Sequence, residues 1–398
     1  MNILIIANFT RDFSESDNGR FLYLAKRLSE KHNVEIITTE FSHGKKDRKS
    51  PIVIQYPFKI TLLKEPGYKK NVSFKRFYSH AVWGKNLRDY LETIPKPDVV
   101  YCAVPSLTGP RYAVEYCKKY NIRFIVDIQD LWPEAFKMVL NIPVLSNFIF
   151  FPFKKKANYI YKNADAVCAV SNTYVRRALD VNPDCKETKA VFIGTEFIHF
   201  DNAAMNNPPN FEKTCAWIGY CGSLGNSYDL PCVFNALEIL KLNYNKEPLF
   251  IVMGDGARRS EFEQIVKAKK LNVRFMGFMK YEKMCGILSK CDIVINPIAK
   301  GSAATIINKH ADYAASGAPV INTQESEEYR SLVENYKMGF NCNNGDAAAI
   351  AEKVNFLLER PEYAVKLGKN ARKCGEENFD RKKSYQSIIA LIENNRSM

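Results

Sequence analysis

The sequence predicts an α/β protein made of two doubly wound domains that face a central cleft. Short apolar runs alternate with amphipathic stretches, and this alternation stops at a polar segment and then begins again. The 398 residues, 46% of them hydrophobic, suffice for two cores. Strands and helices in alternation are typical of parallel sheets covered on both faces, with ligands outside the carboxyl ends of the strands.

The first series of strands and helices spans residues 1–197. Its apolar runs predict strands at 3–7, 34–39, 98–102, 123–128, 166–170 and 190–193. Helical patterns lie between most of these strands; in 20–31, for example, Leu22, Ala25 and Leu28 share one face. We expect a parallel sheet with helices on both sides.

A polar segment separates the two series. Residues 198–214 include NAAMNNPPNFEKT, whose proline pair and amides are typical of a linker. The second series, 215–377, predicts strands at 216–221, 249–253, 273–276, 293–296 and 319–322, each followed by a helix. Helical patterns at 361–377 and 381–394 extend beyond the needs of this sheet. The helix in 378–398 is therefore a candidate to cross back to the first domain.

The cysteines and the first residues bear on the cellular compartment. Eleven cysteines are scattered and none forms a CxxC pair, so they predict reduced core thiols and neither a disulfide framework nor a zinc site. The opening segment MNILIIANFTRDF lacks a basic n-region, its apolar run is too short for a signal peptide, and no apolar run of 18 residues follows. We expect a cytoplasmic protein that does not span the membrane.

The net charge of +14 is concentrated in the first half of the chain. Residues 1–200 hold 31 Lys and Arg against 20 Asp and Glu, whereas residues 201–398 hold 26 against 23. A basic face attracts the phosphates of nucleic acid, anionic lipid or a diphosphate substrate. Because the sequence has no RGG repeats, RNP-like aromatic strands or zinc knuckles, we expect no nucleic-acid partner.

Three predicted strands of the second series end in glycine turns. The strand at 216–221 runs into GSLG, the strand at 249–253 into GDG and two arginines, and the strand at 273–276 into Gly277. Glycines let backbone N–H groups approach an anion closely. One such turn is usually only structural. Three in series favour a nucleotide diphosphate as the ligand.

The segment GSAATIINKHADYAASGAPVINT, residues 301–323, organises the second half. It predicts a helix over 305–316, stopped by Gly317 and followed by a buried strand. Lys309 and Asp312 lie three residues apart and share a face of this helix. A cation and a carboxylate near a helix N-terminus suit a phosphorylated ligand that carries a ribose. The alternative is an ordinary helix with an incidental ion pair.

Several segments, taken in order, carry a family resemblance. They are GSLG, MGDG, NVRFMGF, CDIVINP and DYAASGAPV in the second half, and NGRFLYLAKRL, DIQDLWPE and NADAVCAVS in the first. Together they resemble the retaining GT-B glycosyltransferases of family 4, also called group 1, which have two Rossmann-like domains. DIQDLWPE resembles the D-x-R-D-x-W-P segment of bacterial O-antigen and capsule transferases for fucosamine-like sugars.

The resemblance implies a metal-independent enzyme without a cofactor. Such an enzyme transfers a sugar from a nucleotide diphosphate, for which we expect UDP, with retention of anomeric configuration. The resemblance places the acceptor on the domain 1–197 and the nucleotide sugar on 215–377. Lys309 is then the cation that stabilises the leaving diphosphate. The expected donor-binding residues are Gly19, Gly222, Ser223, Gly225, Gly254, Gly256, Arg258, Phe278, Thr305, Asn308, Lys309 and Asp312.

The sequence departs from the family pattern at several positions. Many members have two glutamates eight residues apart, for which this chain has Ala304 and Asp312. Ala304 cannot hydrogen-bond to a sugar hydroxyl, which suits a deoxy or acetamido sugar. The basic residues that often follow the first glycine turn are absent from GSLGNSYDL.

The segment DIQDLWPE supplies the candidates for a catalytic base. Asp130 is our first choice, Asp127 the second and Glu134 a third, because a retaining transfer needs a group that orients or takes the acceptor proton. Gln129 stands where many family members have a histidine. The alternative is that these aspartates cap the following helix. The resemblance also implies front-face substitution, in which the leaving phosphate helps to deprotonate the acceptor.

Two stretches predict where the acceptor binds. Residues 58–83 interleave aromatic residues with basic ones, among them Lys64, Lys69, Lys70, Lys75 and Arg76. In 143–161 the apolar run 148–153 precedes Lys154, Lys155 and Lys156. This pattern suits a helix edge in a lipid headgroup layer. We therefore expect a polyprenyl-diphosphate-linked saccharide as acceptor and peripheral association with the inner face of the cytoplasmic membrane. The alternative is a core helix with a solvated basic end.

Two other functions remain open at this point. A nucleotide-sugar epimerase on the same fold would need more acidic and histidine groups around the sugar than the sequence offers. A binding scaffold that has lost its chemistry would agree with Ala304 and Gln129, whereas the presence of Lys309 with Asp312 argues against it.

Overall fold

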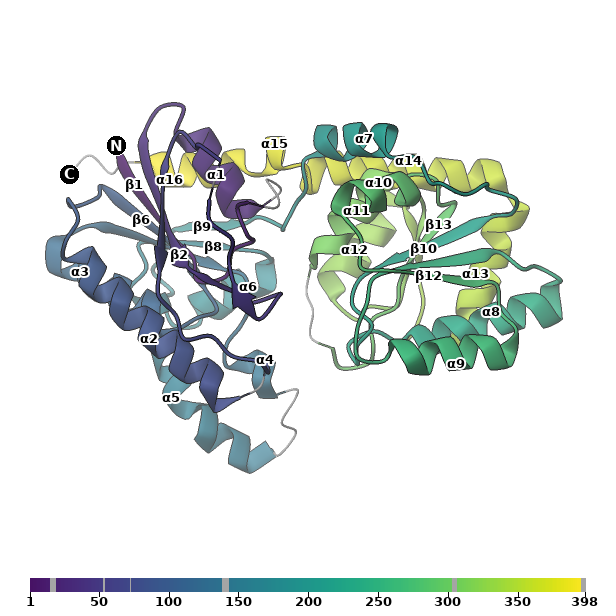
Figure 1. Cartoon of the computed structure of the whole chain (residues 1–398), viewed down its shortest axis with the longest axis horizontal. Helices are drawn as coiled ribbons and strands as arrows, with labels where there is room; N and C mark the ends of the chain where they lie inside the picture. Colours follow the sequence, from purple (N-terminus) through teal and green to yellow (C-terminus); the bar gives the residue numbers. More distant parts are fainter. Residues whose placement is uncertain (15–18, 53, 72, 138–142, 303–305, 395–398) are drawn as a thin grey trace. The chain divides into compact units, whose positions relative to one another are not determined.

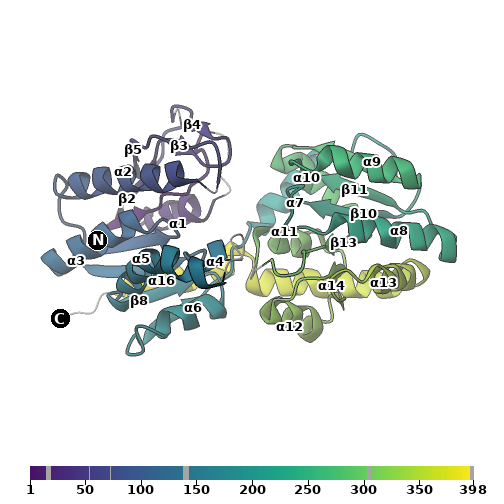
Figure 2. The same ribbon diagram turned by 90° about the horizontal axis from the view of Figure 1, so that it is seen from below.

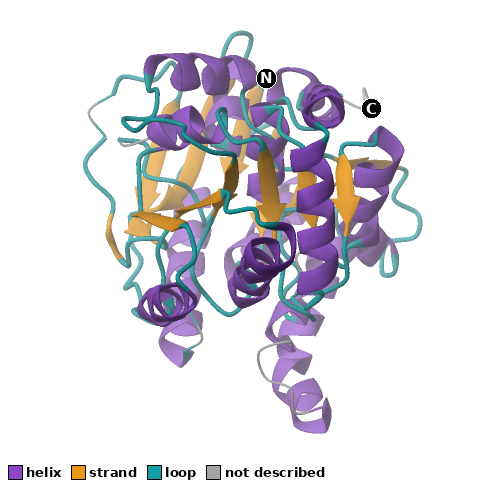
Figure 3. Ribbon diagram, turned by 90° about the vertical axis from the view of Figure 1, so that its right-hand side faces the viewer, coloured by secondary structure: helices purple, strands orange, loops and turns teal. Residues whose placement is uncertain are grey.

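The computed structural model describes residues 1–14, 19–52, 54–71, 73–137, 143–302 and 306–394 (Figure 1). The chain divides into two compact units, of which unit 1 comprises residues 1–192 with 385–398 and unit 2 comprises residues 193–384. Each unit contains one parallel β-sheet with helices on both of its faces (Figures 2 and 3). The predicted α/β class, with two doubly wound units built on parallel sheets, is therefore confirmed.

Unit 1 is built on a seven-stranded sheet. In spatial order its strands are β5 (Lys59–Leu63), β2 (Asn33–Thr39), β1 (Asn2–Ile6), β6 (Val99–Val104), β7 (Arg123–Ile128), β8 (Ala166–Ala169) and β9 (Glu187–Ala190). A separate short hairpin pairs β3 (Phe41–Ser42) with β4 (Asp47–Arg48). Its helices are α1 (Arg20–Leu28), α2 (Phe74–Leu91), α3 (Thr108–Tyr120), α4 (Glu134–Lys137), α5 (Pro143–Lys162), α6 (Asn172–Leu179) and α16 (Gln386–Glu393).

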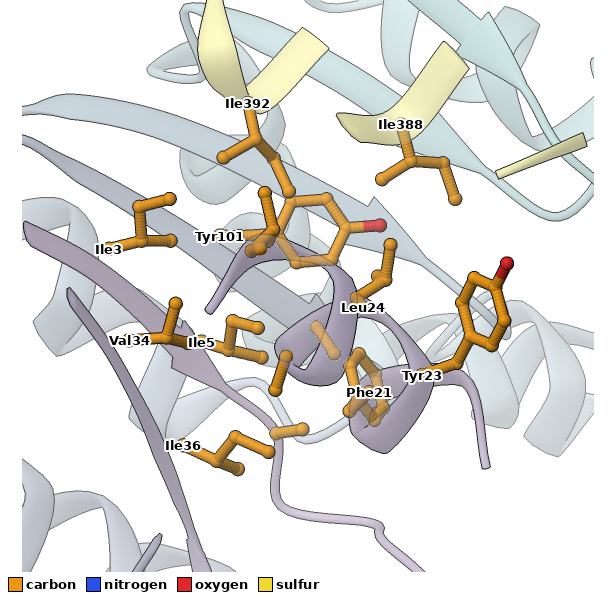
Figure 4. Packing of buried hydrophobic residues seen from close by; sticks show 14 of the residues in the cluster. Ile3, Ile5, Phe21, Tyr23, Leu24, Val34, Ile36, Tyr101, Ile388 and Ile392 are labelled. Carbon is orange, nitrogen blue, oxygen red and sulfur yellow. The ribbon is translucent and has the colours of Figure 1, made fainter. Parts of the chain in front are cut away.

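The last helix, α16, belongs to the core of unit 1. Ile388 and Ile392 are buried in one apolar cluster with Leu24 of α1 and with Tyr101 of β6 (Figure 4). The helical pattern at 381–394 is interrupted in the structure, because α15 (Arg381–Ser384) ends before Tyr385, which is the N-cap of α16. Residues at the end of the chain thus complete a core that begins at residue 3.

Unit 2 is built on a six-stranded sheet with the order β12 (Val273–Gly277), β11 (Leu249–Met253), β10 (Trp217–Cys221), β13 (Ile293–Asn296), β14 (Val320–Asn322) and β15 (Gly339–Asn341). Its helices are α7 (Phe197–Asn206), α8 (Leu230–Tyr244), α9 (Arg259–Lys269), α10 (Tyr281–Leu288), α11 (Asn308–Ser316), α12 (Glu327–Tyr336), α13 (Ala347–Glu359), α14 (Pro361–Asn378) and α15. The chain order reverses between β10 and β13, which is the switch point where such sheets bind ligands.

Most predicted strands agree with the structure to within two residues, and the exceptions have physical reasons. The strand expected at 190–193 lies instead at Glu187–Ala190, a stretch of polar and partly exposed residues without an apolar run. Two strands, β5 at the sheet edge and β15 with its three residues, were not predicted. The segment 198–214 contains most of helix α7, which ends before the prolines at 208 and 209.

No described helix has both the length and the apolar character that are needed to cross a lipid bilayer.

Candidate functional site

The glycine turns of unit 2 pack against one another at the carboxyl ends of β10, β11 and β12. Gly222 N–H donates to the carbonyl of Met253 at 2.9 Å, and Gly254 N–H donates to the carbonyl of Gly277 at 2.9 Å. Gly254 has φ +152°, and a Cβ atom there would lie 1.8 Å from the Gly222 carbonyl oxygen. Only glycine fits at such a distance, so these turns form one compact backbone surface.

Lys309 lies at the switch point, directly beside this surface. It is the second residue of α11, its side chain is 7% exposed, and its ammonium makes no hydrogen bond within the described part of the chain. A Cβ atom on Gly222 would lie 2.5 Å from Lys309 Nζ. The ammonium therefore occupies the space that the missing side chain of Gly222 leaves.

The surroundings of Lys309 are aromatic rather than acidic. Its Nζ lies 4.2 Å from the ring centre of Tyr220 and 3.8 Å from that of Tyr228. Burial lowers the pKa of Lys309 to about 7. An unpaired buried cation at a helix N-terminus, next to a glycine turn, suits an anionic ligand.

Asp312 contacts a tyrosine hydroxyl, whereas the alternative of an incidental ion pair would place it against Lys309. The Tyr281 hydroxyl lies 2.8 Å from Asp312 Oδ1 and 2.8 Å from Thr195 Oγ1. No ion pair joins Asp312 to Lys309, since no described carboxylate lies within ion-pair distance of the Lys309 ammonium. The two residues share a helix face as predicted, but they do not neutralise each other.

The other predicted donor residues differ in their surroundings. Gly256 packs on the turn at 222–225, where a Cβ atom would lie 2.4 Å from the Leu224 carbonyl, whereas nothing lies within 4 Å of such an atom on Gly225. Arg258 forms two hydrogen bonds with Glu261 on the exposed surface of α9. Ser223, Asn308 and Phe278 are exposed, Phe278 to 89%.

Two predicted positions need separate mention. Thr305 and its neighbour Ala304 lie outside the described residues. Gly19 belongs to unit 1, where it is the N-cap of α1.

A polar ladder beside His310 was not predicted from the sequence. Asn296, Asn322 and Asn341 end three neighbouring strands in register, and Asn296 Nδ2 donates to Asn322 Oδ1 at 2.8 Å, as Asn322 Nδ2 does to Asn341 Oδ1. His310 contacts the Asn296 side chain and stacks on Tyr329 with ring centres 3.5 Å apart. An asparagine at the end of two apolar runs, at 296 and at 322, was the available signal.

The predicted base Asp127 proves to be an internal counter-ion. It is fully buried, and its carboxylate accepts hydrogen bonds from Arg20 Nε at 2.9 Å and Arg20 Nη2 at 3.0 Å. Gln129 Nε2 donates a third bond to the same carboxylate at 3.0 Å. Because these donors occupy both oxygens, the geometry does not support Asp127 as a base, and it ties α1 to β7 instead.

Asp130 remains available for the predicted role. Its Oδ1 accepts the Leu131 N–H at 2.9 Å, and it is partly exposed. Burial raises the pKa of Asp130, while hydrogen bonds from Leu131 and Trp132 and the nearby Arg76 guanidinium oppose that rise. The third candidate, Glu134, pairs with Arg177 at 2.7 Å.

We predict that Lys309→Met stabilises unit 2 at neutral pH by about 2 kcal/mol, because it removes a buried unpaired charge. Unfolded lysine keeps its proton up to about pH 10.5, whereas folded Lys309 releases it near pH 7. The stability of the wild type should therefore rise with pH over this window, and the advantage of the variant should shrink. Urea unfolding of the wild type and the variant at pH 7 and pH 9 measures these free energies. A difference between the two proteins that does not change with pH would contradict the prediction.

We also predict opposite roles for the two aspartates in unfolding experiments. Asp127→Asn leaves the Arg20 guanidinium buried without a counter-ion and should cost about 3 to 5 kcal/mol of unfolding free energy. Asp130→Asn keeps an oxygen for the Leu131 N–H and should cost less than about 1 kcal/mol. Equal costs in urea unfolding would show that Asp127 has no special structural role.

Comparison with known proteins adds to this geometry. Residues 202–374 match the family model described as glycosyl transferases group 1, and no curated protein sequence matches the chain. A sucrose-phosphate synthase from Thermosynechococcus elongatus is similar in structure, with a TM-score of 0.71 and 17% identity over 98% of this chain and 96% of that one.

Two further solved structures are similar over the same length. HepE of Anabaena in complex with UDP has a TM-score of 0.69 and 16% identity over 98% of each chain. WaaG, described as a glycosyltransferase involved in lipopolysaccharide biosynthesis, has a TM-score of 0.68 and 13% identity over 98% of this chain and 100% of that one. The chain as a whole thus has the fold of the GT-B glycosyltransferases, and residues 202–374 are similar to the group 1 family.

Proposed function

We propose that this chain is a retaining glycosyltransferase that moves a sugar from UDP to a polyprenyl-diphosphate-linked saccharide during the synthesis of a bacterial surface polysaccharide. The observation that carries the proposal is the buried ammonium of Lys309 at the switch point of unit 2, which has no hydrogen-bond or ion-pair partner among the described residues. A buried charge without a counter-ion is costly. An anionic ligand bound at this position would supply the counter-charge and offset that cost.

The donor is best accommodated with its diphosphate at the N-terminus of α11. Lys309 and the first N–H groups of this helix would face the phosphates, and Asp312 would accept hydrogen bonds from the ribose. The exposed ring of Phe278 follows β12 at the same end of the sheet and offers a surface for the base. UDP is our choice because HepE was solved in complexes with UDP and with UDP-glucose.

The chemistry follows from these charges. Negative charge develops on the diphosphate as the glycosidic bond breaks, and a fixed ammonium at a helix N-terminus stabilises that charge. Since Lys309 already supplies the cation, we propose that no metal is required. In a front-face substitution the leaving phosphate oxygen takes part in deprotonating the acceptor. Asp130, whose pKa is raised by burial, is the carboxylate of unit 1 that we propose for orienting the acceptor hydroxyl.

A membrane-borne acceptor is supported by an exposed face of unit 1. Phe74 and Tyr78 of α2 are 93% and 62% exposed, and Phe151 of α5 is 55% exposed. The two helices meet through Phe77 and Phe153, whose ring centres lie 4.8 Å apart. Exposed lysines flank these aromatic residues in the sequence; they are Lys69, Lys70, Lys75, Lys154 and Lys155. Of the predicted run 148–153, the side chains at 148 and 149 lie outside the described residues.

This face has the chemistry of a lipid headgroup layer. Helix α5 contains four lysines and no acidic residue. Exposed aromatic rings next to lysines favour partition into an anionic interface. We therefore propose that unit 1 binds the inner surface of the cytoplasmic membrane, where a polyprenyl-linked acceptor resides.

For the donor we predict that the wild type binds UDP without added metal and more tightly than GDP. Lys309→Met should weaken UDP binding by about 2 to 4 kcal/mol, at least thirtyfold, because the diphosphate loses its cation. Lys267→Met, on the exposed surface of α9, is the matched control and should bind as the wild type does. Calorimetric titration measures all three proteins. Equal affinity in the Lys309→Met protein would contradict the proposed site.

For the acceptor we predict salt-sensitive sedimentation with vesicles that contain phosphatidylglycerol, and little with phosphatidylcholine alone. The double variant Phe74→Ser/Phe151→Ser should bind such vesicles about tenfold more weakly, because two rings lose their apolar contact. Leu242→Ser removes an equally exposed apolar side chain from unit 2, 74% exposed, and should have no effect. If the double variant sediments like the wild type, this face is not the membrane contact.

A further inference from the structure

The Lys309 side chain is enclosed by two tyrosines that the proposed reaction does not itself use. Its ammonium lies over the ring faces of Tyr220 and Tyr228, at 4.2 Å and 3.8 Å from their centres. The two rings stand edge to face, with centres 5.8 Å apart and planes at 70°. The lysine is thus held by aromatic faces from two sides.

The Tyr220 ring and the backbone that carries Tyr228 are fixed by other contacts. Tyr220 belongs to β10, is fully buried, and donates its hydroxyl hydrogen bond to the Ser223 carbonyl at 2.8 Å. Tyr228 forms an isolated antiparallel bridge with Ile298, and the next residue, Asp229, donates its N–H to the Pro297 carbonyl at 2.9 Å. The segment that carries Tyr228 is therefore tied to the chain that follows β13.

The other ionisable groups around Lys309 do not compete for its charge. Burial raises the pKa of the Cys221 thiol to about 12 and lowers that of His310 well below its usual value, so both are neutral at pH 7. The Asp312 carboxylate interacts with Tyr281. Ring faces attract a cation without neutralising it. The positive charge is thus kept for a ligand.

We propose that Tyr220 and Tyr228 are positioning residues, which form an aromatic clamp that holds the Lys309 ammonium in place for the diphosphate of the donor. The inference rests on the proposed function, because it takes the diphosphate to be the ligand of Lys309. The clamp acts through the lysine and touches neither the sugar nor the reacting atoms.

The clamp predicts a link between ligand binding and protonation. In the unliganded protein the Lys309 ammonium loses its proton near pH 7, whereas a bound diphosphate favours the ammonium form. Binding should therefore take up a proton above pH 7, and affinity should fall by up to about tenfold per pH unit as the pH rises. Removing a ring face destabilises the ammonium, so this dependence should begin at a lower pH.

The test compares UDP binding by the wild type, Tyr228→Phe and Tyr228→Leu between pH 6.5 and 9. Tyr228 is the better target because it is only partly buried, whereas loss of the Tyr220 ring would open the core. Tyr228→Leu should weaken UDP binding about tenfold at pH 7.5. UDP binding to this variant should also take up more protons at that pH than binding to the wild type does. Tyr228→Phe keeps the ring face and should stay within about threefold of the wild type. Calorimetry in two buffers of different ionisation enthalpy counts the protons.

The outcomes separate this inference from the proposed function. Tyr244→Leu, at the exposed end of α8, controls for loss of a tyrosine elsewhere in unit 2, and thermal unfolding checks that each variant is folded. If the wild type binds UDP and Lys309→Met does not, the diphosphate site stands. The clamp is then overturned if Tyr228→Leu binds equally well or more tightly, or shows an unchanged pH profile. If the wild type does not bind UDP, the proposed function and the clamp both fail.

Discussion

One ammonium group, that of Lys309, is buried in unit 2 without a counter-ion among the residues that the structure describes, and the other features of this unit's site depend on it. Lys309 is placed by α11, and room for its Nζ exists because Gly222 has no side chain. Tyr220 and Tyr228 hold the charge without cancelling it, and Asp312, one turn along the helix, interacts with Tyr281. The ring faces lower the free-energy cost of the buried ammonium without removing it. A protein that needed only stability would have an apolar residue at this position.

Unit 1 resolves a similar electrostatic problem in the opposite way. The Arg20 guanidinium is also buried, but its Nε and Nη2 donate to Asp127 at 2.9 and 3.0 Å. Such a pair is satisfied internally and holds elements together, whereas the lysine of unit 2 is left for an external partner. The contrast explains why the two buried cations, Arg20 and Lys309, have different roles. Burial alone does not mark a functional group, and a missing partner is the more informative observation.

The sequence was sufficient for the features that depend on local order. Alternating apolar runs predicted the two parallel sheets, and glycines after three strands predicted the turns beside Lys309. What could not be predicted depends on partners far apart in the chain. Tyr220 and Tyr228 meet Lys309 across more than 80 residues, and Arg20 meets Asp127 across 107. Asp127 and Asp130 look equivalent in DIQDLWPE, because the sequence of this segment does not show that Asp127 is fully buried and Asp130 partly exposed. A strand of three residues such as β15 lacks the apolar run on which strand prediction relies.

The most direct test of the central claim is a crystal structure of the protein with UDP bound. The account predicts an oxygen of the β-phosphate within about 3 Å of Lys309 Nζ, with the Tyr228 ring still against the same ammonium and the first N–H groups of α11 directed at the phosphates. A diphosphate held elsewhere, for example by Arg258 and Arg259 on α9, with the Lys309 ammonium still without an anionic partner, would contradict it.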